Sequence, residues 1–439
     1  MSPLDRYEGI DLNRSMLVTA WTTALLLVAC TPASDVVPTT QLPSTSVQIG
    51  STTTIQPAIR TGVGVGDAVI EVGLMVPRSG PLAVFGESVL RGQVAYWDFI
   101  NEVLGGVGGE FLVELSIVDH GYDTAEAVAL FGHLSSSVVG LTGGLGSPID
   151  EALAPLAEES GLLMVSGSLL SEWAGHPAVV PNLLLPTYRD QVAAGLAWAA
   201  GEGTTGQTGI LYQEGNYGED CVRGYDRAVS DLGFSNVARV AHSLASTDFG
   251  DAVDQLSASE AETVVVCTTP DALVRIIATA ESLDFRPTWL VSAASFDQAV
   301  PTALGGDAGL DAGLAILDRT WILGAGPPPG SPAAQLLQDV FDGVEETNWY
   351  TLLGYGQAAT FHLILEEAFE ASDLTRSGLR EAARRLEGVD LGLDGPLSSL
   401  AGLVPVDASA VGAIDQESLL RPFGIPASEP YFPSPFTTP

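Results

Sequence analysis

The sequence predicts an α/β protein made of two Rossmann-like lobes, whose parallel sheets are joined by three crossover segments. From residue 67 onward, short apolar runs alternate with amphipathic helical stretches, which is typical of parallel sheets covered on both faces. The same series of runs occurs twice along the chain. The 439 residues also exceed the ~250–300 residues at which one hydrophobic core stops growing.

The first series predicts four strands separated by three helices. The expected strands are residues 69–75, 111–118, 138–142 and 162–166. The expected helices are residues 85–104, 124–136 and 148–160. In the first of these helices, Val89, Ala95, Ile100 and Val103 recur at a spacing that places them on one buried stripe.

The second series repeats this pattern. Its expected strands are residues 209–213, 238–244, 263–269 and 288–293, and its expected helices are residues 218–232, 248–258 and 270–283. Later helices are expected at residues 333–342, 349–371 and 374–386.

Three stretches are expected to cross between the lobes, namely residues 181–187, 314–324 and 389–420. The first lobe then comprises residues 67–185 and 315–400, and the second lobe comprises residues 186–314 and 401–425. Residues 426–439 contain too much proline to pack regularly, so we expect a frayed tail there.

The charge balance excludes several classes of function. The chain has 17 basic side chains, all arginine, and a formal net charge of −37. Without lysine, neither a phosphate-binding P-loop nor a pyridoxal phosphate Schiff base can form. The negative charge repels nucleic-acid backbones, so we expect no nucleic-acid partner.

The amino terminus is typical of an exported protein. Residues 16–29 (MLVTAWTTALLLVA) form an apolar run that is shorter than the ~20 residues of a membrane-spanning helix, so residues 1–30 are interpreted as a signal peptide. The run ends at Cys30 in a sequence that resembles a bacterial lipoprotein box, which predicts lipidation of this cysteine. An uncleaved anchor or a secretory peptide without lipid is the alternative. Residues 31–66 are rich in Ser, Thr and Pro, and we expect a flexible tether.

Two cysteines, Cys221 and Cys267, remain for the folded body. Cys221 is expected in the first turn of a helix, and Cys267 is expected at the end of a strand. If the strands concerned are neighbours, their carboxyl ends lie within bridging range, and an oxidising compartment favours a disulfide. Two separate buried thiols are the alternative.

Several segments, taken in order, resemble the branched-chain amino-acid-binding proteins of ABC transporters, which are type I periplasmic binding proteins. The segments are VIEVGLMVPRSGPLAVFGESVLRG, VDHGYDTAEAV, EESGLLMVSGS, LYQEGNYGEDC, ALVRIIATAESLDFRPTWL and WYTLLGYGQAA. The resemblance covers residues 68 to 400. It implies two lobes that close around a small solute and deliver it to a membrane permease.

The resemblance also implies which residues hold the solute. Ser147, in GGLGSP, matches a serine that binds the solute's carboxylate at a helix N-terminus, although an ordinary helix N-cap is the alternative. Ser168 matches a position whose backbone carbonyl binds an ammonium group. Leu170 stands where the family has a threonine, and Ser171 is the possible substitute.

Aromatic walls are the next expected feature. Phe85 and Tyr350 match apolar walls of the first lobe, and Tyr217 is their counterpart in the second lobe, with core packing as the alternative for each. Further expected contacts are Thr268, Thr269 and Trp173.

The second lobe departs from the family at one position. Many amino-acid binders carry an acidic residue where this chain has Ala293, and Asp297 follows a few residues later. Burying an unpaired ammonium group costs several kcal/mol. The sequence therefore leaves two possibilities: the solute lacks an amino group, or its amino group reaches Asp297.

The leading hypothesis is a lipid-anchored, monomeric solute-binding protein of an ABC importer, located outside the cytoplasm. Its solute would be an amino acid, an amide or a carboxylate. A module that signals ligand occupancy to a membrane receptor is the alternative. A hydrolase is not expected, because the nucleophile motif G-x-S-x-G is absent. The five histidines lack metal-ligand spacing, so no metal or other cofactor is expected.

Overall fold

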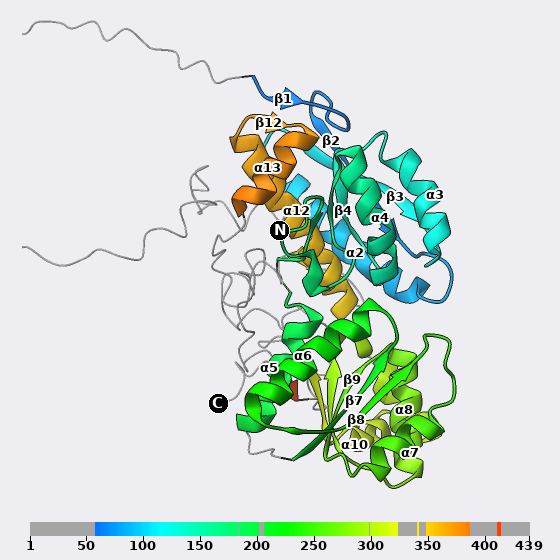
Figure 1. Cartoon of the computed structure of the whole chain (residues 1–439). Helices are drawn as coiled ribbons and strands as arrows, with labels where there is room; N and C mark the ends of the chain where they lie inside the picture. The colour runs from blue at the N-terminus through cyan, green and yellow to red at the C-terminus, as the bar shows by residue number, and fades with distance from the viewer. Residues whose placement is uncertain are drawn as a thin grey trace, which may run out of the picture. The chain divides into compact units, whose positions relative to one another are not determined.

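The computed structural model describes residues 58–183, 185–201, 206–297, 299–323, 340–341, 348–386 and 411–413 (Figure 1). The expected signal peptide with Cys30, most of the tether and the tail lie outside the described residues. So do most of the expected helix at 333–342 and most of the third crossover segment.

The first lobe is built on a parallel sheet of five strands in the order β3-β2-β4-β5-β6. The strands are β2 (Val69–Val76), β3 (Leu112–Asp119), β4 (Gly140–Gly144), β5 (Leu163–Val165) and β6 (Val179–Val180). The central strand β2 is almost entirely buried, as its run of apolar residues predicts.

The second lobe is built on a sheet of six strands in the order β13-β11-β10-β9-β7-β8. The strands are β7 (Gln207–Gln213), β8 (Ser235–His242), β9 (Thr263–Cys267), β10 (Thr288–Ser292), β11 (Thr320–Leu323) and β13 (Val411–Ala413). All neighbours pair in parallel except β13, which is antiparallel to β11.

Helices connect these strands as the alternating pattern predicts. In the first lobe they are α2 (Ala83–Phe99), which continues as a π-helix (Ile100–Leu104), α3 (Thr124–Leu134), α4 (Ser147–Ser160), α12 (Trp349–Glu370) and α13 (Arg376–Leu386). In the second lobe they are α5 (Tyr188–Gly201), α6 (Asn216–Leu232), α7 (Gly250–Ala258), α8 (Pro270–Ser282), α9 (Ala299–Gly305) and α10 (Leu310–Ile316). No helix in the described ranges combines the length and apolarity that crossing a membrane requires.

Helix α12 packs directly along α2. A side chain at Gly92 of α2 would place its Cβ 1.9 Å from the carbonyl oxygen of Thr351, so only glycine permits this approach. Asn348 caps α12 by accepting the N–H of Thr351, whose hydroxyl in turn accepts the N–H of Asn348. The contact between the helices brings Phe85 of α2 beside Tyr350 of α12.

Two expectations about segment boundaries are wrong. The expected crossover at 314–324 contains the end of α10 and all of β11, and β11 pairs with β10 from Trp289↔Thr320 to Ser292↔Leu323. This segment therefore belongs to the second lobe rather than the first. Since β11 lies in the second lobe and α12 in the first, the chain changes lobe after β11. The expectation is wrong because a crossover and a buried strand have the same sequence pattern, an apolar extended run.

The end of the expected tether is also ordered. Strand β1 (Arg60–Thr61) pairs with β12 (Asp373–Leu374), as Figure 1 shows, and Arg60 forms an ion pair with Asp373. Farther along, the N–H of Glu71 donates to the carbonyl of Gly64. Residues 60–66 are thus part of the first lobe.

Candidate functional site

The expected site residues follow the carboxyl ends of strands in both sheets. Ser147 and Ser168 follow β4 and β5 of the first lobe, whereas Tyr217 and Thr268 follow β7 and β9 of the second lobe. In open α/β sheets this edge is where ligands bind. Hydrogen bonds described below connect the two edges.

Ser147 lies at the amino terminus of α4 and is buried. The N–H groups of Ile149 and Asp150 donate to the carbonyl of Gly146, so Gly146 is the N-cap and Ser147 is the first helical residue. The alternative interpretation of Ser147 as an ordinary helix N-cap is therefore wrong. Within the described residues neither its N–H nor its hydroxyl has a hydrogen-bond partner, and the helix dipole adds a partial positive charge there. This end of α4 can accept an anionic group.

The loop after β5 is held by a buried carboxylate that the sequence reasoning missed. Asp150 accepts the hydroxyls of Ser166 at 2.6 Å and Ser168 at 2.9 Å and the N–H of Gly167 at 3.0 Å. Burial raises the pKa of Asp150 to about 6, although these hydrogen bonds oppose the rise. The carbonyl of Ser168, expected to bind an ammonium group, accepts the hydroxyl of Ser166 at 2.8 Å.

A buried amide joins this loop to the end of β4. The Nε2 group of Gln357 on α12 donates to the carbonyls of Gly144 at 3.0 Å and Ser166 at 3.1 Å. Its Oε1 accepts the N–H of Gly144 at 3.3 Å and the Nε2 group of Gln93 at 3.3 Å. Gln357 therefore fixes the relative positions of the two loops that carry Ser147 and Ser168.

Ser171 contacts the second lobe instead of facing an open space. Its hydroxyl and its N–H both donate to Asp220 of α6, which is fully buried. Asp220 also accepts the backbone N–H of Arg189 and pairs with the guanidinium of Arg223 at 2.9 Å. The hydroxyl expected to replace a threonine is thus engaged in a contact between the lobes.

Aromatic side chains gather at the same edges. The rings of Phe85 and Tyr350 stack with centroids 4.5 Å apart, and the rings of Tyr188 and Tyr217 meet edge to face at 4.6 Å. Tyr350 reaches across from α12 and donates its hydroxyl to the carbonyl of Ala294, in the turn after β10, at 2.6 Å. We call Tyr122, Tyr188, Tyr217 and Tyr350 the tyrosine cluster.

The hydroxyls of the tyrosine cluster stay protonated at neutral pH. Burial raises the pKa of Tyr122 and of Tyr217 to about 12, and it also raises the pKa of Tyr188 and of Tyr350 well above the ordinary value. The charged neighbours that act on these hydroxyls are the carboxylates of Asp150, Glu151 and Asp297. The cluster therefore carries neutral hydroxyls in acidic surroundings, although the hydroxyl of Tyr350 already donates to Ala294.

The remaining expected contacts in the second lobe serve local structure. Tyr217 shares a hydrogen bond with the Ser295 hydroxyl at 3.2 Å, and that hydroxyl accepts the N–H of Thr268 at 2.8 Å. The hydroxyl of Thr268 contacts His242 Nε2 at 2.8 Å. Thr269 caps α8 by accepting the N–H of Ala272.

Asp297 and Trp173 complete the expected contacts. One carboxylate oxygen of Asp297 accepts the N–H of Ala299 at 2.8 Å, and burial raises the pKa of this carboxyl. The indole Nε1 of Trp173 is buried without a hydrogen-bond partner in the described part of the chain.

Cys221 and Cys267 form the expected disulfide, with Cα atoms 6.6 Å apart. Strands β7 and β9 are neighbours, and Tyr212 pairs with Cys267. The amino-terminal part of α6, which carries Tyr217 and Asp220, is thereby bonded to the carboxyl end of β9.

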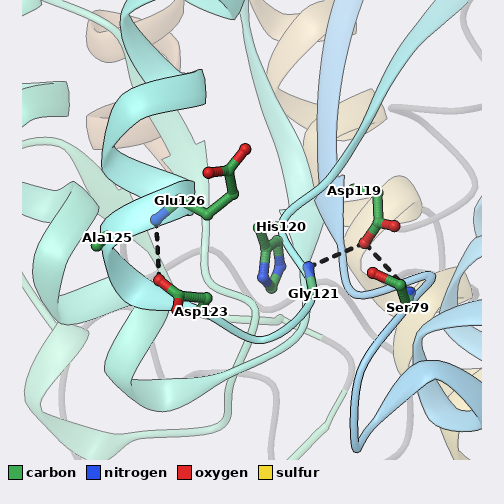
Figure 2. A pocket seen from close by; sticks show the side chains of 7 residues that line it. All are labelled: Ser79, Asp119, His120, Gly121, Asp123, Ala125 and Glu126. Atoms are coloured by element: carbon green, nitrogen blue, oxygen red, sulfur yellow. Dashed lines mark hydrogen bonds between the residues drawn. The ribbon is translucent and has the colours of Figure 1, made fainter.

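An open pocket of about 580 Å³ lies next to the turn that carries Tyr122 (Figure 2). Two of its carboxylates already cap local structure: Asp119 accepts the N–H groups of Ser79 and Gly121, and Asp123 accepts the N–H of Glu126. Among the described residues, no group of three or more His, Cys, Asp or Glu side chains could hold a metal ion.

Sequence reasoning missed four residues of this site: Tyr122, Tyr188, Asp150 and Gln357. Tyr122 occurs in VDHGYDTAEAV, just after an expected strand, and this position alone could have identified it. The other three depend on contacts between segments far apart in the sequence.

Comparison with known proteins identifies the family. The model of the periplasmic binding protein family matches residues 69–404. A Leu/Ile/Val-binding protein homologue from Brucella melitensis is 26% identical over 206 residues, which are 44% of this chain and 53% of that relative. The match therefore spans about half the length of this curated relative.

Solved structures show the same fold. A fatty acid ABC transporter substrate-binding protein from Thermomonospora curvata superimposes with a TM-score of 0.69 at 24% identity, over 82% of this chain and 92% of that one. A leucine-binding protein from Thermotoga maritima gives a TM-score of 0.63 at 18% identity, over 79% and 95%. The chain belongs to the periplasmic binding protein family, a family of solute-binding proteins, and has its type I fold.

Proposed function

We propose that this chain is the extracytoplasmic solute-binding component of an ABC importer. Its solute is a small amino-acid-like compound, an amide or a carboxylate, bound between the amino terminus of α4 and the tyrosine cluster. The proposal rests first on the N–H and hydroxyl of Ser147, which have no partners in the described part of the chain and lie at the same sheet edge as the aromatic side chains. Relatives named for leucine and for fatty acid transport support the solute class.

The surroundings of the cluster restrict the charge of the solute. Asp150, Glu151 and Asp297 are the charged groups that act on the tyrosine hydroxyls. A carboxylate on the solute would therefore rely on N–H and O–H donors, as a helix N-terminus provides them. A solute with two negative charges would meet uncompensated repulsion from the carboxylates.

The contacts between the lobes fit a protein that closes around its solute. Ser171 donates to Asp220, and Tyr350 donates to the carbonyl of Ala294. Hinge closure of two lobes is a common response to ligand binding. These hydrogen bonds would form on closure and would stabilise the closed state, which retains the solute until its release to a permease.

A thermal-shift screen of amino acids, carboxylates, amides and peptides against the chain without its first 57 residues tests the proposal. We expect one class to raise the melting temperature of the wild-type protein. Tyr217→Ala should abolish that shift, whereas Tyr212→Ala on β7 should retain it. An equal shift in the Tyr217 variant would overturn the site, and no shift with any class would overturn the function.

A further inference from the structure

The turn that follows β3 carries an aromatic residue in an unfavourable backbone conformation. Tyr122 has φ of +62°, in the left-handed region that residues with bulky side chains rarely adopt. Such strain persists only where neighbouring structure enforces it, and it is concentrated at functional sites. The need to form a turn does not by itself explain why a tyrosine occupies this position.

Several hydrogen bonds enforce this conformation. The N–H of Tyr122 donates to Nδ1 of His120 at 3.2 Å, and the N–H of Asp123 donates to the carbonyl of His120 at 2.8 Å. The N–H of Gly121 donates to Asp119 at 2.9 Å. Burial lowers the pKa of His120, so its ring remains neutral at pH 7 and Nδ1 can accept. Figure 2 shows His120 inside this turn, between the caps formed by Asp119 and Asp123.

The turn places the ring of Tyr122 over the amino terminus of α4. A Cβ atom built on Gly146 would lie 2.7 Å from Cε2 of Tyr122. Gly146 itself has φ of +130°, which favours glycine for a second reason. The residue that follows Gly146 is Ser147, whose N–H and hydroxyl lack partners within the described residues.

The hydroxyl of Tyr122 has no use in the fold. Among the described residues it makes no hydrogen bond, although the side chain is only half-exposed. Its high pKa, about 12, keeps it protonated and able to donate. Tyr188 and Tyr350 lie close enough to interact with it electrostatically.

We propose that Tyr122 contacts the solute, and that its hydroxyl joins the N–H and hydroxyl of Ser147 as a third donor to the solute's carboxylate. This assignment rests on the proposed function and refines it, because it makes a carboxylate the group bound at α4. The turn from Asp119 to Asp123 keeps its strained backbone in order to hold the ring over Gly146.

The test measures binding by calorimetry with four probes: L-leucine, 4-methylpentanoate, L-phenylalanine and 3-phenylpropanoate. We expect the wild-type protein to bind at least one of them. Tyr122→Phe removes only the hydroxyl, so it should weaken that probe about tenfold or more, as expected for a hydrogen bond to a charged group. Its melting temperature without a probe should equal that of the wild type. Tyr212→Phe is the matched control and should leave the affinity unchanged.

Tyr122→Gly separates a binding role from packing. Glycine adopts a positive φ without strain, so this variant should melt at or above the wild-type temperature and lose most of the binding. A melting temperature several degrees lower would show that the ring is core packing and would overturn the inference.

The remaining outcomes are also decisive. An unchanged affinity of Tyr122→Phe for a probe that the wild type binds would overturn the inference and leave the proposed function intact. Binding of none of the probes by the wild type would contradict a carboxylate at α4. The proposed function would then be decided by the thermal-shift screen described above.

Discussion

Removal of the disulfide between Cys221 and Cys267 should destabilise the second lobe by a predictable amount. The cysteines are 46 residues apart in the sequence. The chain-entropy model assigns about 3 kcal/mol to a 15-residue loop and about 4.7 kcal/mol to a 100-residue loop, so this bond contributes about 4 kcal/mol. This loss in the free energy of unfolding should be several times that of an ordinary surface substitution, which usually changes stability by less than about 0.5 kcal/mol.

Urea unfolding followed by circular dichroism measures this loss. The double variant Cys221→Ser and Cys267→Ser should unfold at lower urea, with the free energy of unfolding reduced by about 4 kcal/mol. Reductant should produce a similar loss in the wild-type protein and no further loss in the double variant, which is the control. A double variant within about 1 kcal/mol of the wild type, well below the expected loss, would refute the reasoning.

Three further predictions concern Asp150, Gln357 and Cys30. The carboxyl pKa of Asp150 rises from 3.8 to about 6 on folding, so the native state binds more protons than the unfolded state. Between about pH 4 and pH 7 this group therefore lowers the free energy of unfolding by about 2.4 kcal/mol. Urea unfolding at both pH values should show this loss in the wild type relative to Asp150→Asn, and an unchanged difference between the two proteins would contradict it. Gln357→Leu removes the hydrogen bonds that its amide makes with the N–H of Gly144 and with two carbonyls, and it should cost about 2–4 kcal/mol. A loss below about 1 kcal/mol, the size of one ordinary hydrogen bond, would show that other groups satisfy these backbone atoms. Cys30→Ser should move the full-length protein from the membrane fraction to the soluble fraction. Retention of this variant in the membrane fraction would contradict lipid anchoring at Cys30.

The regular parts of both sheets could be predicted from the sequence because buried strands are marked by short apolar runs. The run at 69–75 corresponds to β2 (Val69–Val76), and the run at 263–269 contains β9 (Thr263–Cys267). Glycine, proline and polar turns at the ends of these runs limit the error to a few residues. The duplication of the pattern then gave the two lobes.

The parts that could not be predicted depend on partners distant in the sequence. Strand β1 is defined only by its pairing with β12, more than 300 residues away, so its segment reads as a polar tether. Helix α5 is apolar around most of its surface and shows little periodicity. Strand β11 resembles a crossover because both are extended and buried.

The candidate site shows the same division. Ser147, Tyr217 and Tyr350 could be located because each stands at a recognisable strand end or helix start. The role of Asp150 could not be predicted, because its partners, such as Ser166, belong to a loop that the fold brings to the start of α4. Nor could the contact between Ser171 and Asp220, which requires both lobes to be in place.

A crystal structure of the protein with the solute found by the thermal-shift screen tests the central claim most directly. We expect electron density for the solute against the N–H and hydroxyl of Ser147, with the ring of Tyr217 on its other side. Density for the solute at any other place, with the space between Ser147 and Tyr217 filled by side chains, would contradict the account.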